Sequence, residues 1–259
     1  MDIEENIRLF QQYQKSNKLE KASEIADEIA KELKADDKRV LCANHILEFY
    51  LFEYYFQTRD YEAVRYPVHQ MYHSLAKKYM ERMHFDKAYE KLVKAAEWNA
   101  VDMDIYWEKT ECLKQLGELK KLKETTKELH KFIYTRADIA HFYRNIGYYY
   151  VEKKEPEKAM VLYTYSNMFS HSKTADSELN FLETALEREC PEYTVDKIQK
   201  EIRKLKLPDG ISETTLTIIL RAGQLELEQG DKTSGVECME LLYQVTGDEH
   251  IRKIIEAES

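Results

Sequence analysis

The sequence repeats one helix-pair pattern three times between residues 69 and 169. Small or short side chains mark equivalent positions in the copies: Ala76 and Thr110 lie 34 residues apart, and Thr110 and Gly147 lie 37 residues apart. A period of this length is characteristic of proteins built from stacked supersecondary units, none of which buries its apolar face alone. We therefore expect a stack of helix pairs in which each pair contacts mainly its neighbours.

The clearest copy, residues 69–102, carries apolar residues on one face of each of two helices. Side chains spaced i, i+3, i+4 and i+7 share a helix face. The first helix has this spacing at Tyr72, Leu75, Ala76 and Tyr79, and the second carries Ala88, Leu92 and Ala95. We expect Ala76 and Ala88 to lie where the helices cross, because larger side chains would hold the backbones apart.

The next two copies, residues 103–136 and 140–173, keep most of these positions, although Lys109 and Thr110 replace the apolar and small pair in the former. At these positions the chain resembles the tetratricopeptide repeat family. The resemblance implies an all-α solenoid, a right-handed superhelix of antiparallel helix pairs, as a single domain over residues 1–259. Weaker helix pairs are expected at 3–36, 40–68, 174–207 and 213–247. A helix that caps the end of the stack is expected at 249–257.

Residues 40–68 fit the pattern least well. An aromatic helix is predicted from about Val40 to Gln57, and Asp60 begins what resembles a second helix, but Pro67 follows within two turns. Proline interrupts a helix because it lacks an N–H and its ring clashes with the preceding turn. The second helix is therefore either short, the interpretation that we favour, or kinked at Pro67 and continuous with the next unit.

Composition excludes several classes of protein. With 7 Gly, 4 Pro and no alternating apolar runs, strands are not expected, while 43% hydrophobic and 34% charged residues suit an ordered helical chain. The net charge of −9 argues against general binding to nucleic acid or anionic membranes, which needs clustered Lys and Arg. Two locally basic stretches, Lys120–Lys131 and Lys197–Lys206, also carry Glu at helical spacing, so we interpret both as solvated faces with ion pairs.

Cysteine spacing and hydropathy point to a cytoplasmic protein. The four cysteines show no paired spacing, which predicts neither a disulfide framework nor a zinc site and fits a reducing compartment. The richest apolar run, Phe49–Phe56, contains Glu53 and is far shorter than the roughly 18 residues that a membrane span requires. We expect a buried helix there.

Motifs for catalysis and cofactor binding are absent. The sequence contains no GxGxxG, GxxxxGK[ST], HExxH or GxSxG pattern. His69 and His73 stand at i, i+4, but no nearby cluster supplies the further ligands that a metal site needs. We expect no enzyme activity, no cofactor and no metal.

Tyrosine is abundant, with 19 residues, and most of those in the repeats are expected to be structural. Tyr72, Tyr79, Tyr106, Tyr143, Tyr150 and Tyr163 fall on packing positions. The family resemblance also implies that the first helices line a concave groove, with groove positions offset by two or three residues from packing positions. This offset selects His73, Lys77, Met80, Trp107, Glu111, Lys114, Gln115, His141, Arg144, Asn145, Tyr148 and Glu152. Aromatic, amide and guanidinium groups suit recognition of a peptide.

One subtype of the family is excluded by its own motif. Chaperone-binding members hold a terminal carboxylate with Lys and Asn from one repeat, Asn from the next, and Lys and Arg from a third. Asn145 occupies the middle position, but Trp107 and Glu111 stand where Lys and Asn are required. A glutamate would repel the carboxylate.

The sequence therefore predicts a non-enzymatic adaptor or scaffold that binds a protein or peptide in the groove, with self-association left open. A second hypothesis is a peptide-sensing regulator, because the chain also resembles the repeat half of bacterial peptide-responsive transcription regulators. No helix-turn-helix is recognisable, since residues 1–34 read as a repeat. A third hypothesis, RNA binding through helical repeats, conflicts with the net charge of −9.

Overall fold

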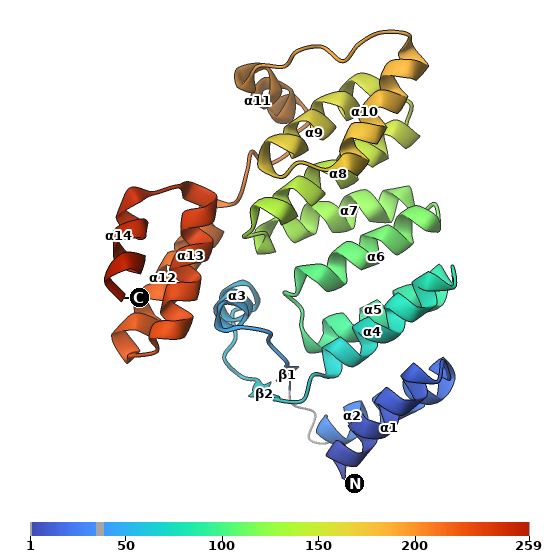
Figure 1. Ribbon diagram of the computed structural model, residues 1–259, viewed down its shortest axis with the longest axis vertical. Helices are drawn as coiled ribbons and strands as arrows, with labels where there is room; N and C mark the ends of the chain where they lie inside the picture. Colours follow the sequence, from blue (N-terminus) through green and yellow to red (C-terminus); the bar gives the residue numbers. More distant parts are fainter. Residues whose placement is uncertain (1, 35–38, 259) are drawn as a thin grey trace. The chain divides into compact units, whose positions relative to one another are not determined.

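The computed structural model describes residues 2–34 and 39–258, and the described chain is almost entirely helical. Its elements are fourteen α-helices, one 3-10 helix and two strands of two residues each (Figure 1). The predicted fold class, an all-α solenoid of helix pairs, is confirmed. Internal contacts divide the chain into two compact units, Met1–Gly117 (unit 1) and Glu118–Ser259 (unit 2). That residues 1–259 form a single repeat domain stays a prediction.

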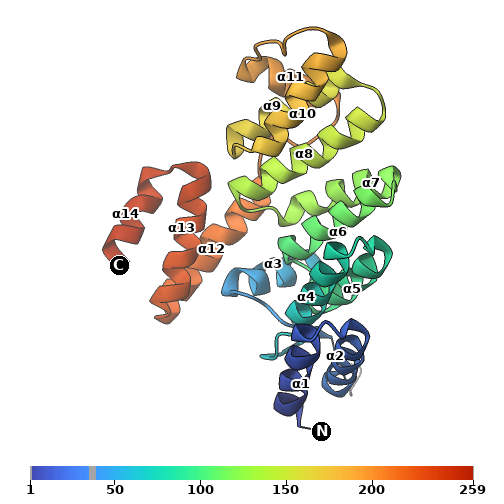
Figure 2. The same cartoon turned by 45° about the vertical axis from the view of Figure 1, so that its right-hand side comes forward.

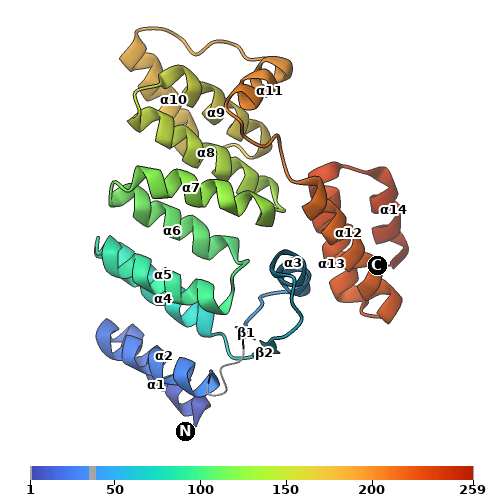
Figure 3. The ribbon, with the colours of Figure 1, turned by 180° about the vertical axis from the view of Figure 1, so that it is seen from behind.

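Unit 1 contains two helix pairs and one further helix of the repeat. These are α1 (Ile3–Lys15), α2 (Leu19–Leu33), α4 (Val68–Glu81), α5 (Phe85–Trp98) and α6 (Met103–Gln115). The helices pack in the order α1 on α2, α2 on α4, α4 on α5 and α5 on α6. Helices α1 and α4 lie nearer the viewer in Figure 1. Helices α2 and α5 lie nearer the viewer in Figure 3, which shows the opposite side. Residues 35 and 36, at the end of the predicted first pair, lie outside the described residues.

The packing positions of the repeat form the core of unit 1. Ala76 and Ala88 are fully buried, as expected for residues at a helix crossing. The ring of Tyr72 is also buried, while its hydroxyl donates to Asp27 Oδ1 over 2.6 Å and so joins α4 to α2. Tyr106 is the exception among the predicted core tyrosines: it is half-buried, and its hydroxyl donates to the Ala100 carbonyl.

Residues 39–67, which we call the insert, depart from the repeat. They contain β1 (Val40–Leu41), α3 (Ile46–Phe56) and β2 (Glu62–Ala63), and the two strands pair in parallel. The prediction of a helix beginning at Val40 was therefore wrong at its start, as was the expectation that strands are absent. The predicted aromatic helix itself is present as α3, and it ends at Phe56, before the C-cap residue Gln57, whose backbone is left-handed with a φ of 50°.

The second helix predicted near Asp60 does not form, because its backbone bonds to the strand instead. The Glu62 amide donates to the Arg39 carbonyl over 2.8 Å, and the Val64 amide donates to the Leu41 carbonyl over 2.9 Å. Pro67 then serves as the N-cap residue of α4. Neither alternative for Pro67 was correct: it precedes a helix, where its missing N–H costs no hydrogen bond.

The insert lies beside the ends of α4 and α5 (Figure 2). The Cys42 amide donates to the Trp98 carbonyl at the end of α5 over 2.8 Å, and the Cys42 thiol donates to the Tyr66 carbonyl. The chain therefore leaves the helix stack after α2, forms α3, and returns to begin α4 at the same edge of unit 1.

Unit 2 begins with a stack of helices and ends with a three-helix segment. Its elements are α7 (Leu119–Leu129), η1 (His130–Phe132), α8 (Arg136–Glu152), α9 (Pro156–Phe169), α10 (Lys173–Leu186), α11 (Val195–Lys204), α12 (Glu213–Gln229), α13 (Lys232–Thr246) and α14 (Glu249–Glu258). Helix α7 packs on α8, α8 on α9, and both α10 and α11 on α9; α13 then lies between α12 and α14. Residues 174–207 therefore hold two helices that share α9 as their neighbour.

Local sequence signals set the helix ends in unit 2. The Thr135 hydroxyl accepts from the Asp138 amide at the start of α8, and Pro156 is the first residue of α9. Gly147 lies at the crossing of these two helices. A Cβ there would lie 3.3 Å from the buried Tyr163 ring, so the repeat position needs a small residue.

Candidate partner-binding surfaces

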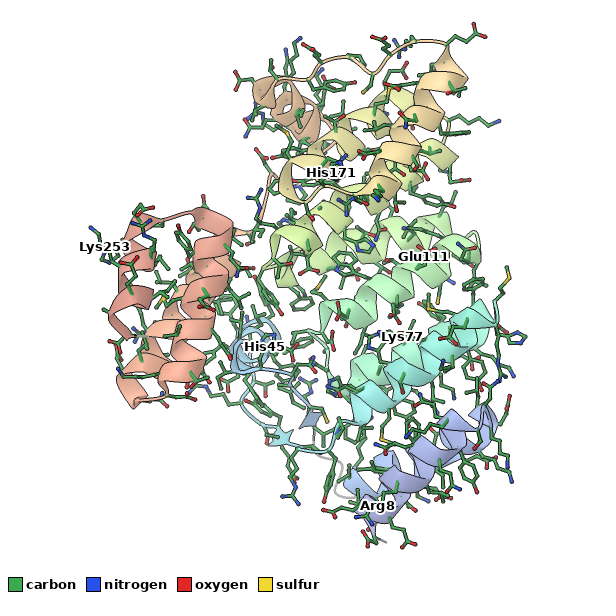
Figure 4. The ribbon with its side chains drawn as sticks, in the orientation of Figure 1. Arg8, His45, Lys77, Glu111, His171 and Lys253 are labelled. Atoms are coloured by element: carbon green, nitrogen blue, oxygen red, sulfur yellow. The ribbon has the colours of Figure 1, made fainter. Side chains whose placement is uncertain are left out.

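Two helices of unit 1 bring predicted groove residues together. His73 and Lys77 lie one turn apart on α4, and both contact the Glu108 carboxylate of α6: His73 Nε2 is 2.9 Å from Oε2, and Lys77 Nζ is 3.3 Å from Oε1. The predicted residues Glu111 and Gln115 follow on α6, where the Gln115 side chain donates to Glu111 Oε1 over 2.9 Å. Figure 4 labels Lys77 and Glu111 on the two helices.

We call this group the unit 1 surface. It comprises His73, Lys77, Glu108, Glu111, Lys114 and Gln115. Two of its charged groups remain accessible to a partner, because the side chain of Lys77 is 54% exposed and that of Glu111 is 40% exposed. Lys114 lies 3.2 Å from Glu111 and is more enclosed. The surface thus offers alternating positive and negative groups along two helices.

Sequence reasoning selected Trp107 rather than Glu108, and the structure places them differently. Trp107 is only 6% exposed, while Glu108 meets the α4 side chains. Adjacent helix residues point about 100° apart, so an error of one residue in the groove offset exchanges a packing position for a surface position. A buried ring offers a partner little area, so Trp107 does not belong to the surface that we propose.

The predicted residues of unit 2 lie on α8, where Arg144 binds the end of the neighbouring helix. Its guanidinium Nη2 donates to the Ser170 carbonyl. Arg136 acts similarly, donating to the Phe169 and Met168 carbonyls over 3.0 Å each. The last carbonyls of a helix lack internal partners and carry partial negative charge, so two arginines cap α9 favourably. Burial lowers the pKa of Arg144, whose Nε atom is buried.

Acidic and imidazole groups surround this cap. Asp176 of α10 accepts from the Asn167 side chain over 2.8 Å, and His171 Nε2 lies 2.9 Å from the other Asp176 oxygen. Asp176 also attracts the Arg144 guanidinium. His171, labelled in Figure 4, has a side chain that is 71% exposed and is therefore accessible to a partner.

The other predicted residues on α8 differ in exposure. His141 and Tyr148 are half-buried, Glu152 is exposed, and Asn145 is fully buried. Asn145 therefore belongs with Trp107 among residues that pack rather than face a partner. The unit 2 surface consists of His141, Arg144, Tyr148, Glu152, His171 and Asp176.

A polar group in unit 1, which the sequence did not reveal, joins the insert to the helix ends, and all its members except the exposed Asn44 are buried. We call it the edge cluster: Asn44, Glu48, His69, Asn99 and Asp102. The Glu48 carboxylate is 2% exposed and accepts from the Asn44 amide over 2.6 Å and the Asn99 side chain over 2.7 Å. The Asn44 side-chain amide also donates to Asp102 Oδ2 over 2.9 Å. These partners lie as far as 58 residues apart in sequence, so local sequence spacing could not predict that they meet.

Burial controls the charge of the edge cluster. It raises the pKa of the Glu48 carboxyl and lowers the pKa of His69 to about 4, although nearby Asp102 opposes the latter effect. The neutral His69 ring donates from Nε2 to Asn44 Oδ1 over 2.8 Å, and its Nδ1 atom has no hydrogen-bond partner in the described chain. His69 is thus a packed structural histidine, and His73 instead faces Glu108.

The described residues contain no cluster of three or more His, Cys, Asp and Glu side chains that could hold a metal ion. Residues 2–34 and 39–258 likewise include no helix long and apolar enough to cross a bilayer.

Comparison with known proteins adds no functional assignment. No protein-family model matches the chain, and no curated protein matches it. A solved structure described as "Functional Characterization of Pseudomonas Aeruginosa pilF" is similar over 99% of this chain and 97% of its own, with 12% sequence identity and a TM-score of 0.46. Similarity at that level supports no argument about this protein, and the fold rests on the helices and contacts described above.

Proposed function

We propose that this protein is a non-enzymatic interaction module that binds a segment of a partner protein on the first helices of its repeats. The observation that supports this most directly is the Glu108 carboxylate, which joins His73 and Lys77 of α4 to α6. It aligns the polar faces of two consecutive first helices. A partner segment lying across them meets groups from both repeats at once.

The unit 1 surface can exchange its internal ion pairs for contacts with a partner. Exposed ion pairs contribute only about 0–1 kcal/mol, because water screens them and the long side chains lose freedom. Lys77 is the exposed member of the Lys77–Glu108 pair, and Glu108 keeps His73 as a partner, so moving Lys77 to a partner carboxylate costs the folded protein little. The exposed Glu111 carboxylate offers the complementary site for a partner Lys or Arg.

This arrangement suits a short peptide segment with charges of both signs. A short linear segment bound in this way typically reaches micromolar affinity, about −8 kcal/mol. Trp107 is buried, so it cannot add contact area with the partner as an aromatic anchor would. Specificity would therefore come mainly from charge placement, which also predicts that binding weakens as salt is added.

The experiment compares charge reversals at two neighbouring positions of α4. Lys77→Glu changes the unit 1 surface, whereas Lys78→Glu, the matched control, changes a lysine that pairs with Glu81 on its own helix. Partners captured from the native lysate by the wild type are expected to persist with Lys78→Glu and to fall about tenfold or more with Lys77→Glu. Titration calorimetry with the recovered partner then gives the affinities.

A second reversal checks the α6 half of the surface. Glu111→Lys is expected to weaken the same partner as Lys77→Glu does, with the circular dichroism spectrum unchanged. If both variants bind the partner as the wild type does, or if the Lys78→Glu control loses it equally, the unit 1 surface is not the binding site.

A further inference from the structure

A second surface, at the opposite end of the α8 helix from its N-cap, gathers lysines around two tyrosine rings. We call it the lysine–tyrosine patch: Lys123 of α7, Tyr149 and Tyr150 of α8, Lys153 at the C-cap of α8, and Lys158 of α9. Helices α7 and α9 both pack on α8, so the start of α7, the end of α8 and the start of α9 lie at one edge of unit 2 (Figure 1).

The ammonium groups lie over the ring faces. Lys123 Nζ is 4.2 Å from the centroid of Tyr149 and 5.3 Å from that of Tyr150. Lys153 Nζ is 5.8 Å from the Tyr149 centroid, and Lys158 Nζ is 5.1 Å from that of Tyr150. A cation is attracted to the negative face of an aromatic ring within about 6 Å. These contacts restrain three flexible side chains.

The two tyrosine rings differ in burial, so one packs in the core and the other lies partly at the surface. Tyr150 is 7% exposed and packs into the core, whereas Tyr149 is half-buried. Their centroids are 5.2 Å apart with an interplanar angle of 79°, an edge-to-face pair. Tyr150 therefore packs against Tyr149 from the protein side, and the partly exposed Tyr149 ring lies beside Lys123 and Lys153.

Two of the lysines keep an uncompensated charge. Lys158 pairs with Glu155, and on α7 Lys120 pairs with Glu124 and Lys121 with Glu118. By contrast, neither Lys123 nor Lys153 forms an ion pair with a carboxylate within the described part of the chain. A ring face attracts an ammonium group but does not neutralise it, and each ammonium carries three N–H donors. The interpretation of Lys120–Lys131 as a solvated face with ion pairs therefore does not extend to Lys123.

We propose that the lysine–tyrosine patch binds an acidic segment of a partner protein, with Lys123 and Lys153 pairing its carboxylates. This proposal goes beyond the function assigned to the first-helix surfaces and does not depend on it. Because the ring contacts already restrain the lysines, a carboxylate meets preorganised donors and less side-chain entropy is lost on binding. The apolar edge of Tyr149 accommodates the methylene groups of a Glu side chain.

Charge around the patch favours a short acidic peptide over a long polyanion. The chain as a whole carries a net charge of −9, and Glu118, Glu124, Glu152 and Glu155 lie on the same three helices and their turns. These carboxylates repel an extended phosphate backbone beyond the patch, since such binding requires many Lys and Arg contacts. Two unpaired lysines match two carboxylates of one peptide.

The test uses two fluorescein-labelled nonapeptides, one built from Glu and Ala and the other with every Glu replaced by Gln. Anisotropy titrations with the full chain at low salt are expected to show binding of the acidic peptide only, and weaker binding as salt is raised. Lys123→Gln/Lys153→Gln is expected to raise the Kd by about fivefold or more, because both unpaired charges are lost. Lys120→Gln, on the same helix but already paired with Glu124, is expected to change it less than twofold, or about 0.4 kcal/mol or less.

Tyr149→Leu separates the role of the ring from that of overall charge. It removes the ring that restrains Lys123 and Lys153 but leaves every charge in place, so weakened binding of the acidic peptide is expected. Circular dichroism of each variant checks that the helices persist. Equal binding of the two peptides, an unchanged Kd for the double lysine variant, or an equal loss with Lys120→Gln would each overturn the proposal. None of these variants alters the unit 1 surface, so the two functional tests fail independently.

Discussion

The two units each fasten an irregular segment to repeat helices, and they use different chemistry to do so. In unit 1 the insert is joined to the ends of α4, α5 and α6 by the edge cluster, in which two carboxylates and a histidine are buried. In unit 2 the turn Pro208–Gly210, before α12, is joined to α8 and α9 by tyrosine hydroxyls. The connection in unit 1 therefore buries carboxylates, whereas that in unit 2 depends mainly on tyrosine hydroxyls.

The edge cluster exploits helix ends. Glu48 lies in the first turn of α3, His69 lies in the first turn of α4, and Asp102 is the N-cap residue of α6, where it accepts from the Asp104 amide over 3.0 Å. Helix N-termini carry partial positive charge and unpaired amides, which favours acidic groups nearby. A buried carboxylate that accepts several hydrogen bonds is stable at a helix N-terminus. Removing it leaves its buried donors without an acceptor, which costs free energy.

The unit 2 turn is held by hydrogen bonds that need no charge on the ring partners. The Tyr143 hydroxyl donates to the Pro208 carbonyl over 2.9 Å and accepts from the Gly210 amide over 2.8 Å. Tyr165 donates to Asp209, and His130 Nε2 donates to the Gly210 carbonyl over 2.7 Å. Burial raises the pKa of Tyr143 and lowers that of His130, so both rings are neutral at neutral pH. We therefore expect the stability of the two connections to respond differently to side-chain deletion and to pH.

Removing the Glu48 carboxylate should produce the largest effect. Glu48→Ala leaves the buried Asn99 donor without its acceptor and also removes the acceptor of the Asn44 amide, and we expect the free energy of unfolding to fall by about 3 kcal/mol. Glu48→Gln, the matched control, keeps one carbonyl acceptor and should lose less. Urea unfolding of both variants measures the difference. A loss below about 1 kcal/mol for Glu48→Ala would mean that the cluster does not hold the insert.

Acidification should weaken unit 1 through His69. Its pKa falls from 6.5 to about 4 on folding, so the unfolded chain binds more protons between these values. The stability that His69 contributes is present above pH 6.5 and is lost as pH falls through about 4, by about 3 kcal/mol at most. Protonation would also place an N–H at the buried Nδ1 atom, which has no acceptor in the described chain.

The comparison with His69→Gln isolates this effect. Glutamine can still donate to Asn44 but does not titrate, so its unfolding free energy should change less between pH 6.5 and 4 than that of the wild type. Glu48 acts in the opposite sense: its pKa is raised, so its contribution is present below 4.5 and is lost as pH rises through the folded value. Because Glu48 is present in both proteins, its contribution cancels. Parallel pH profiles for the two proteins would show that His69 does not titrate as we infer.

The sequence was sufficient to predict the fold class and the packing residues, because these depend on local periodicity. Ala76, Ala88 and Gly147 are buried at helix crossings as the spacing indicated. The insert was not predictable in the same way. Residues near Asp60 have helical character, but pairing of β2 with β1 brings together backbones 22 residues apart, as at Val40 and Glu62. Tertiary hydrogen bonding there prevails over local propensity.

The candidate surfaces were predictable only to within about one residue. His73 and Lys77 of the predicted set do meet across two helices, but their partner is Glu108, next to the predicted Trp107. The spacing between packing and groove positions that the family resemblance implies specifies only a face of the helix. Side-chain size decides which of two adjacent residues on that face is buried. Arg144 was interpreted as a partner-binding group, and its bond to the Ser170 carbonyl could not be foreseen because it joins α8 to the end of another helix.

Deleting one hydroxyl in unit 2 should give the smallest effect and the sharpest contrast with Glu48. Tyr143→Phe removes one donor and one acceptor, but Pro208 and Gly210 are half-buried, so water can replace both bonds. We expect a loss of about 1 kcal/mol in the free energy of unfolding. Tyr149→Phe, whose hydroxyl forms no hydrogen bond in the described residues, is the control and should cost less. Because the hydroxyl stays neutral below its raised pKa, the difference between wild type and Tyr143→Phe should be the same at pH 6.5 and pH 8. If Tyr143→Phe instead destabilises the protein more than Glu48→Ala, the unit 2 connection is the stronger one, and the buried carboxylates are not what distinguishes the two units.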